Sequence, residues 1–280
     1  MCSKVFWRKT MADISLTASM RSNLLSLQQT QSLMDTTQER LSTGKKVNSA
    51  IDNPSSYYTA QSLTNRASDL SSLLDSMGQA VQTIQAANEG IEAITEFASQ
   101  AKAIATSAND TSEADSVENY MKQFDEILKQ IDGIAKDSGY KGVNLLGGED
   151  QELKVVFNED RSSSLTIQGV DGSAAGLGLT PETDWSENTA IDAVLTKIDS
   201  AVSTLRSMSS EFGNNYSVVQ TREEFTENLI NVLEEGSDKL TLADMNEESA
   251  NMLALQTRQQ LAINSLSLAS QASQSVLKLF

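Results

Sequence analysis

Few residues of this chain have types and spacing that could support chemistry. Gly44, Lys45 and Lys46 match the last positions of a phosphate-binding loop, but the earlier glycine of such a loop is missing and no predicted strand precedes it. We therefore interpret this run as a turn between helices. The other candidates are carboxylates that could bind a metal or transfer protons: Glu223, Glu224, Glu227, Glu234 and Glu235.

These glutamates fall on the polar side of a helical stripe that contains Val219, Phe225, Leu229 and Val232. Acidic residues beside an apolar helical stripe are typical of a solvated helix face. The sequence therefore favours a solvated face over a metal site or an acid–base pair. We expect no catalytic, cofactor-binding or metal-binding residue.

The composition removes most classes of enzyme. The 280 residues include no histidine and one cysteine, Cys2, so no Ser/His/Asp or Cys/His triad and no intramolecular disulfide can form. Lys and Arg number 21 against 38 Asp and Glu, which gives a net charge of −17. Such a balance argues against binding nucleic acid or an anionic membrane. We expect a protein that is not an enzyme and has no cofactor.

Two long segments carry apolar residues at a constant step of seven. The first contains Leu63, Leu70, Met77, Ile84 and Ile91, and the second contains Ile191, Ile198, Leu205, Phe212 and Val219. Heptad spacing predicts helices over about 56–108 and from 191 to about 235. We expect the first set to form the core of antiparallel coiled-coil rods.

The spacing changes between the two rods. Apolar residues three and four apart predict a helix over about 115–137. Two strand-like runs, 152–157 and 164–168, then flank a polar turn, which is typical of a β-hairpin. The predicted fold is mainly α, with long antiparallel coiled-coil rods and a small β-hairpin region in the middle of the chain.

The two ends of the chain differ from its middle. Residues 12–50 and 240–280 carry net charges of +1 and −1, and both are rich in Ser, Thr, Gln, Asn and Leu. Segments of this kind bury too little apolar surface to offset the ordering entropy of about 1–2 kcal/mol per residue. We therefore expect the ends to order on association with a partner.

Three separated runs resemble sequences of bacterial flagellins. Residues 39–52, ERLSTGKKVNSAID, are similar to the signature that follows the first helix of that family. Residues 140–146, YKGVNLL, resemble a turn of the family, and residues 242–280 resemble its last helix. Because the three matches come in family order and include both ends, the chain is identified as a member of the flagellin family.

The resemblance implies a structural subunit that polymerises into the flagellar filament for swimming motility. In the family, the terminal helices form an inner tube, and the central helices with the hairpin surround it. The middle segment, 138–187, is too short for a large outer domain, so a minimal subunit is expected. Two alternatives remain open: the junction protein between hook and filament, which has the same fold, and a signalling coiled-coil protein.

The resemblance also divides the chain into six segments. They are 1–11, an upstream extension; 12–50, the N-terminal inner-core helix and connecting turn; 51–137, the long core helices of the outer tube; 138–187, the hairpin and Gly-rich region; 188–239, the second long core helix; and 240–280, the C-terminal inner-core helix.

Candidate site residues follow from the same resemblance. The inner-core positions expected to carry polymerisation are Leu24, Leu27, Leu33, Leu261, Leu266, Leu268, Val276 and Leu277. The candidate positions for O-glycosylation, where an unmodified polar turn is equally consistent, are Ser162, Ser163, Ser164 and Ser173.

The resemblance finally implies partners and a location. The expected partners are other copies of the chain, the hook–filament junction protein, the filament cap and an export chaperone. We expect the protein to be secreted by the flagellar export apparatus into the extracellular filament. The stretch 97–104 lacks the arginines of the family's patch for an animal innate immune receptor, so weak or no activation of that receptor is expected.

Overall fold

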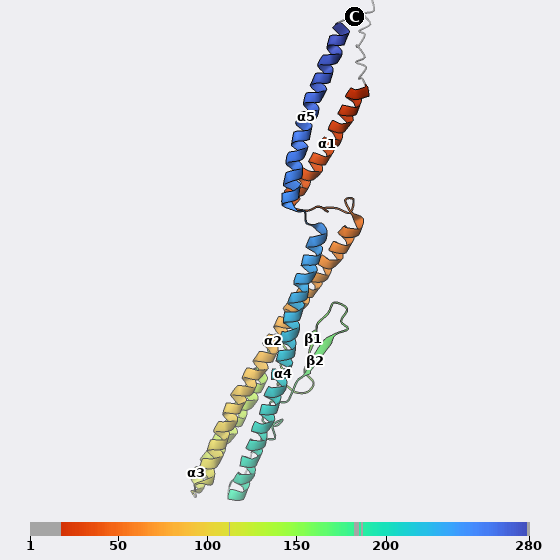
Figure 1. Ribbon diagram of the computed structural model, residues 1–280. Helices are drawn as coiled ribbons and strands as arrows, with labels where there is room; N and C mark the ends of the chain where they lie inside the picture. The colour runs from red at the N-terminus through yellow and green to blue at the C-terminus, as the bar shows by residue number, and fades with distance from the viewer. Residues whose placement is uncertain (1–17, 112, 182–184, 186, 279–280) are drawn as a thin grey trace, which may run out of the picture. The chain divides into compact units, whose positions relative to one another are not determined.

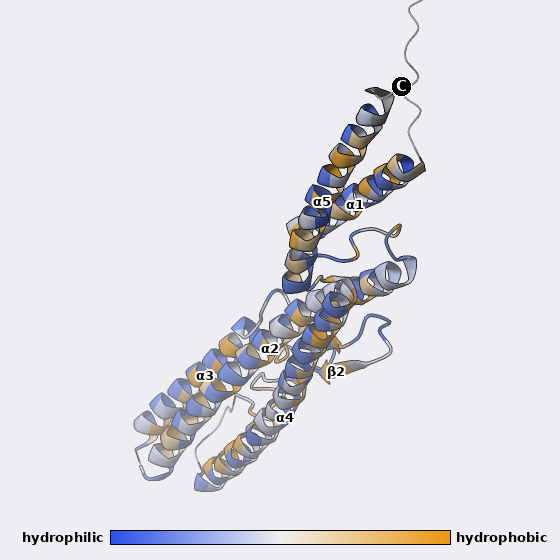
Figure 2. Ribbon diagram, turned by 45° about the horizontal axis from the view of Figure 1, so that its top comes forward, coloured by the Kyte–Doolittle hydropathy of each residue, from blue (hydrophilic) through white to orange (hydrophobic). Residues whose placement is uncertain are grey.

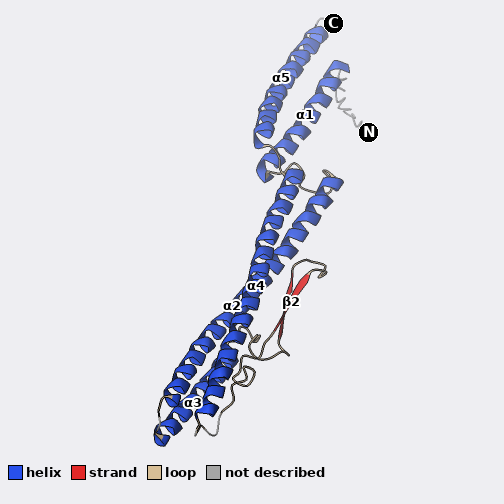
Figure 3. Ribbon diagram, turned by 60° about the horizontal axis from the view of Figure 1, so that its bottom comes forward, coloured by secondary structure: helices blue, strands red, loops and turns tan. Residues whose placement is uncertain are grey.

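The structure is a computed structural model that describes residues 18–111, 113–181, 185 and 187–278. The expected extension at 1–11 lies outside these residues. Within them the chain forms α1 (Ala18–Thr43), α2 (Pro54–Asn109), α3 (Ala114–Asp137), β1 (Glu152–Val156), β2 (Ser164–Gln168), α4 (Asn188–Thr241) and α5 (Met245–Lys278) (Figure 1). Helices dominate and the two strands form one small ribbon, which confirms the predicted fold class (Figure 3).

The chain folds into two compact units. The first comprises residues up to 62 together with residues from 236 onward, and the second comprises residues 63–235. The first unit therefore contains α1, α5 and the adjoining ends of α2 and α4. Among the helices described, none is long and apolar enough to cross a membrane.

The second unit is built on an antiparallel pair formed by α2 and α4. Lys102 on α2 pairs with Asp199 on α4 (Nζ···Oδ1 2.5 Å). Further along α4, Ser209 donates over 2.8 Å to Asn88, which lies earlier on α2. Helix α3 lies beside this pair (Figure 1) and buries Phe124 in the shared core.

Most heptad residues of both rods line this core. Met77, Ile84 and Ile91 are at most 2% exposed in it, whereas Leu70, also 2% exposed, and the half-buried Leu63 belong to a second cluster with Leu233. Their counterparts on α4 are no more exposed: Ile191, Ile198, Leu205, Phe212 and Val219. The predicted helices agree with α2, which extends two residues earlier than 56, and with α4, which continues to Thr241.

The β-hairpin is held against the bundle by two arginines. Strand β1 pairs with β2 in antiparallel register, with Val155 opposite Leu165. At the hairpin tip, Glu159 pairs with Arg66 of α2 (2.5 Å) and the Phe157 ring lies 5.2 Å from the Arg222 guanidinium of α4. The tip therefore contacts both long helices.

The turn that follows α3 fits closely against α2. Asn144 donates from Nδ2 to the Ala135 carbonyl (2.8 Å) and accepts from the Leu146 N–H (2.9 Å), which closes the end of α3. Gly90 of α2 lies under this turn, where a Cβ atom would be 2.8 Å from Leu146 Cδ1 and would also overlap Ser138 Oγ. Glycine is thus the residue that allows the two segments to approach.

Candidate polymerisation surface

The flagellin-like signature after α1 forms a turn in the first unit. Gly44 adopts φ +70°, which favours glycine, and its N–H donates to the Arg40 carbonyl (2.8 Å) at the end of α1. Lys46 N–H then donates to Thr241 O (2.7 Å), and Ala243 N–H donates to Gly44 O (2.9 Å). The run 44–46 therefore joins the two chain segments that lead to α2 and α5.

The second half of the signature is organised by Asp52. Its Oδ2 accepts hydrogen bonds from the N–H groups of Ser49 (2.8 Å) and Asn48 (3.0 Å) and from Ser49 Oγ (3.2 Å). The backbone N–H groups of Ser49 and then Asn48 lower the pKa of the Asp52 carboxyl below its ordinary 3.8. Asn53 next accepts from Ser56 N–H (3.1 Å) and caps α2, with Pro54 as first helical residue.

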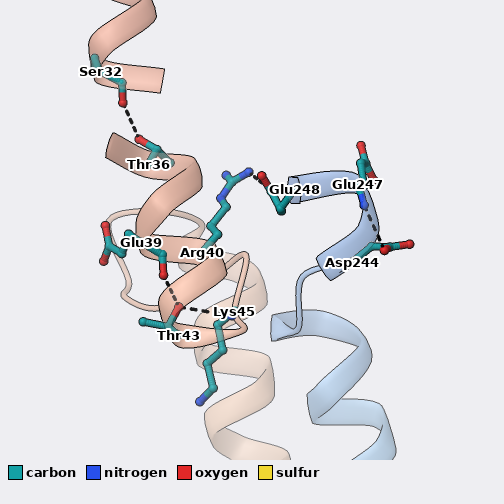
Figure 4. Close-up of polar contacts among 9 residues, drawn as sticks. All are labelled: Ser32, Thr36, Glu39, Arg40, Thr43, Lys45, Asp244, Glu247 and Glu248. Atoms are coloured by element: carbon teal, nitrogen blue, oxygen red, sulfur yellow. Dashed lines mark hydrogen bonds and ion pairs between the residues drawn. The ribbon is translucent and has the colours of Figure 1, made fainter. Parts of the chain in front are cut away.

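Helix α5 begins at a matching cap and pairs with α1. Asp244 Oδ1 accepts from the N–H groups of Asn246 (2.9 Å) and Glu247 (3.2 Å). One turn into α5, Glu248 points toward Arg40 of α1 and accepts a hydrogen bond over 2.9 Å (Figure 4).

The seam between α1 and α5 is rich in polar side chains. On α1 the most buried residues are Met20, Thr30 and Thr37. Thr30 donates to the Ser26 carbonyl of its own helix over 2.8 Å. Across the seam, Gln259 of α5 donates from Nε2 to Gln31 Oε1 (2.8 Å).

Apolar side chains of the same two helices lie outside this seam. Among the expected polymerisation positions, Leu24, Leu33, Leu261 and Leu268 are 40–67% exposed. Leu27 and Leu266 are instead half-buried. The side chains of Val276 and Leu277 lie outside the part of the chain that the structure describes. Figure 2 shows apolar residues distributed along both helices, among polar ones.

Three further exposed residues belong to this surface and were not identified in the sequence. They are Leu25, Leu253 and Ile263, at 52–66% exposure. The sequence shows that these residues are apolar within polar segments. It does not show whether they face the partner helix or the outside, because that depends on where the two helices meet. Together with Leu24, Leu33, Leu261 and Leu268 they form what we call the outward leucine surface.

The carboxylates considered for chemistry lie on α4. Glu224, Glu227, Glu234 and Glu235 are exposed, and Glu223 is half-buried. Among the described residues no group of three or more acidic or cysteine side chains is placed to hold a metal ion.

The candidate glycosylation serines lie in turns and at a strand end. Ser162 and Ser163 are at the hairpin tip, where Ser162 Oγ accepts from Asn158 Nδ2 over 2.8 Å. Ser164 begins β2. Ser173 Oγ accepts from the Gly176 N–H over 3.1 Å. Ser162 and Ser164 are exposed, and Ser163 and Ser173 are half-buried.

Comparisons with known proteins match this chain to one family over most of its length. Residues 14–151 match the family model for the bacterial flagellin N-terminal helical region, and residues 195–280 match that for the C-terminal helical region. Flagellin FljK of Caulobacter vibrioides is 33% identical over 92% of this chain and 94% of its own length. A flagellin of Brucella melitensis is 30% identical over 96% of this chain and 99% of its own length.

Among solved structures, the crystal structure of Bacillus cereus flagellin aligns with 54% of this chain and 88% of its own, at 15% identity and a TM-score of 0.48. The sequence relatives carry the assignment, because they match nearly from end to end. They indicate a structural subunit that polymerises into the flagellar filament and serves motility. The chain belongs to the bacterial flagellin family.

Proposed function

We propose that subunits polymerise through the outward leucine surface of α1 and α5. The observation that carries this proposal is the exposure of large apolar side chains on both helices. Only Met20 on α1 and Leu255 on α5 are buried apolar residues of the described parts of these helices, beside buried Thr30 and Thr37, whereas the residues of the outward leucine surface are 40–67% exposed. Leu253, Leu261 and Leu268 are 62–67% exposed in one subunit. Covering them in an assembly would gain about 25 cal/mol for each Å² of apolar surface.

This assignment makes α1 and α5 the inner core of the filament, as the family scheme implies, and α2 to α4 with the hairpin its surrounding layer. The half-buried Leu27 and Leu266 would stabilise the pair itself. Val276 and Leu277 remain part of the proposed polymerisation set by resemblance alone. We infer that the subunit acts mechanically and performs no catalysis.

Aspartate substitutions test the proposal. Leu261→Asp with Leu268→Asp adds two charges to the surface, and we expect seeded filament growth to be lost. The matched control, Gln260→Asp with Ser267→Asp, adds the same charges at exposed polar positions of α5. Electron microscopy after addition of short filament seeds gives the readout. Parent-like filaments from the leucine variant would overturn the proposal.

Other partners and the location follow from family membership as proposals. We infer secretion through the flagellar export apparatus to the extracellular filament, with contacts to the junction protein, the filament cap and an export chaperone. The exposed Ser162 and Ser164 and the half-buried Ser163 and Ser173 are proposed sites for O-glycosylation, which the intact mass of the secreted protein would test. The stretch 97–104 contains Lys102, paired with Asp199, and no arginine, which supports weak or absent activation of the innate immune receptor.

A further inference from the structure

Strand β1 is bonded along one edge only. It pairs with β2 in a sheet of two strands, which lies beside the long helices (Figure 3). Two hydrogen bonds fix which groups of β1 face β2: Phe157 N–H donates to Ser163 O (2.9 Å), and Gly169 N–H donates to Gln151 O (2.6 Å). Bonded residues alternate along an antiparallel pair, so the odd-numbered residues from 151 to 157 face β2.

The even-numbered residues of β1 present their backbone to the other edge. The N–H and C=O groups of Glu152, Lys154 and Val156 point away from β2. Among the described residues, no backbone hydrogen bond uses these groups. Lys154 is exposed and Val156 is half-buried. A row of unpaired backbone groups is a template for pairing with another extended chain. We call this row the open edge.

A groove follows the open edge, between β1 and α2. Its volume is about 510 Å³, and four consecutive residues of β1, 153–156, line it. Residues of both faces of the strand thus take part, as expected for a groove along the strand's edge. The other wall is α2 from Leu73 to Thr83, a stretch of about 15 Å. A strand of five residues, the length of β1, extends over about 17 Å, so the groove matches a segment of that size.

The groove is lined by three cations and by no Asp or Glu. The cations are Lys141, Lys154 and Arg161, and all three are exposed. None of them enters an ion pair found between described residues. The two acidic residues that precede Arg161 are engaged elsewhere, because Glu159 pairs with Arg66 and Asp160 accepts from the Ser162 N–H over 3.0 Å. The groove therefore favours an acidic occupant.

We propose that the open edge of β1 binds an extended acidic segment of a partner protein, which joins the hairpin as a third strand. Backbone hydrogen bonds to Lys154 and Val156 would supply affinity, and the side chains of the groove would select the sequence. The site lies in the second unit and is separate from the outward leucine surface, so it does not depend on polymerisation.

The register of β1 defines the side chains that the segment needs. Residues directly opposite each other in a sheet point to the same side. Positions opposite Leu153 and Val155 point toward the core, in which Val155 is 3% exposed, so apolar residues fit there. The position opposite Lys154 points to the outer side, where an acidic residue would pair with it. A second acid opposite Val156 would lie at the hairpin-tip end, to which Arg161 belongs.

A designed peptide tests this pairing. The probe is acetyl-Glu-Val-Glu-Val-Thr-amide, which in antiparallel alignment sets its central Glu opposite Lys154 and its Thr opposite Glu152. It is added to the full-length chain without filament seeds. At about ninefold excess over its dissociation constant, hydrogen exchange of the Lys154 and Val156 amides should slow about tenfold. The Thr166 amide, which points to the outer edge of β2, should exchange as before.

A backbone change and a charge swap give the controls. Methylation of the central Glu nitrogen of the peptide removes a donor aimed at β1 and should weaken binding at least tenfold. Lys154→Glu should also weaken binding about tenfold, and a peptide with Lys at its centre should bind this variant within about threefold of the parent pair. Lys122→Glu, at an exposed position of α3, changes the net charge equally and should leave binding unchanged. Far-ultraviolet circular dichroism verifies that the variants are folded.

The outcomes decide between a binding edge and a guarded one. If no peptide concentration slows exchange at Lys154 and Val156, the proposal is wrong, and Lys154 acts to discourage strand pairing. Equal slowing at Thr166, equal binding of the methylated peptide, or no recovery in the charge swap would each contradict pairing at the open edge. All of these measurements use unassembled subunits, so a failure of filament growth leaves their result unaffected.

Discussion

Arg40 on α1 donates a hydrogen bond from Nη1 to Oε1 of Glu248 on α5 over 2.9 Å, although 208 residues separate them in the chain. The Glu248 side chain is 9% exposed, whereas that of Arg40 is 38% exposed. The pair therefore fixes the register of the two helices at the end nearest their connecting turns. A second polar contact, Gln259 to Gln31, lies further along the same seam.

Removal of one partner of this ion pair should loosen α5. In Arg40→Met the Glu248 carboxylate stays buried without its charged partner, and we expect a destabilisation of about 1–3 kcal/mol for the helix pair. Hydrogen exchange of the α5 amides, followed by mass spectrometry, should accelerate. The double variant Arg40→Met with Glu248→Leu should exchange more slowly than the single variant, because no charge is left unpaired. Parent-like exchange in Arg40→Met would show that the pair is dispensable.

Two helical glycines should respond in opposite directions to alanine. Gly90→Ala places a methyl group against Ser138 and Leu146, and overpacking of this kind typically destabilises by about 1–3 kcal/mol. Gly213→Ala on α4 meets no atom within 4 Å and should stabilise by up to about 1 kcal/mol through helix propensity.

The measurement for this pair is urea unfolding of the second unit, followed by Trp185 fluorescence. Trp185 is buried against Phe124, with ring centroids 5.3 Å apart, so its emission reports on this core. A Trp7→Phe background leaves Trp185 as the sole tryptophan. Equal unfolding midpoints for the two alanine variants would contradict the steric role of Gly90.

The turn at 48–52 should depend on pH through Asp52. Because its folded pKa lies below the ordinary 3.8, the ionised carboxylate stabilises the turn above pH 3.8, and this contribution is lost as the pH falls further through the folded value. Amide chemical shifts of Asn48 and Ser49 should thus be steady from about pH 6 to pH 4 and change below that. Asp52→Asn keeps an acceptor oxygen and should remove the titration. A midpoint above 3.8 in the parent protein would show that these hydrogen bonds do not favour the charged form.

Substitution of a buried and of an exposed apolar residue should have different effects on subunit stability and on filament assembly. Ile84 is 1% exposed, and Ile84→Ala should lower the free energy of unfolding by about 2–5 kcal/mol. Leu261 is 62% exposed, and Leu261→Ala should change subunit unfolding by less than about 0.5 kcal/mol while raising the critical concentration of seeded growth. Urea titration and sedimentation of filaments measure the two quantities. A large loss of subunit stability in Leu261→Ala would place that side chain in the fold instead of the assembly.

The long helices of the second unit were predictable because apolar residues fill nearly every core position. The step of seven from Leu63 to Ile91 placed the first rod within two residues of α2. The hairpin was also predictable from the sequence, because its strands are short apolar runs on either side of a polar turn. The first strand ends at Val156 instead of 157, although Phe157 N–H still donates to Ser163 O (2.9 Å).

The arrangement of α1 against α5 could not be predicted in the same way. Thr30 and Thr37 are buried on α1, and Gln259 of α5 bonds to Gln31. These polar residues interrupt buried apolar positions such as Met20 and Leu255, so no continuous hydrophobic period marks the seam. The partnership of Arg40 with Glu248 joins distant parts of the chain, which local patterns do not encode. Gly90 was also missed, because the need for glycine arises from a turn about fifty residues later that fits against it.

The antiparallel pairing of α2 with α4 makes the subunit tolerant of added length. Asn109 at the end of α2 donates to Asp192 at the start of α4 over 3.3 Å. The residues between them, which include the hairpin, therefore begin and end at the same end of the helix pair. A peptide inserted at the hairpin tip, between Asp160 and Arg161, would keep Glu159 on the strand side of the insertion, where it pairs with Arg66, and would leave the pairing of α2 with α4 unchanged. Loop-closure entropy rises by only about 0.6 kcal/mol for each doubling of a loop. The tip is therefore a natural site for grafting an epitope or an enzyme, which the filament would then display once per subunit.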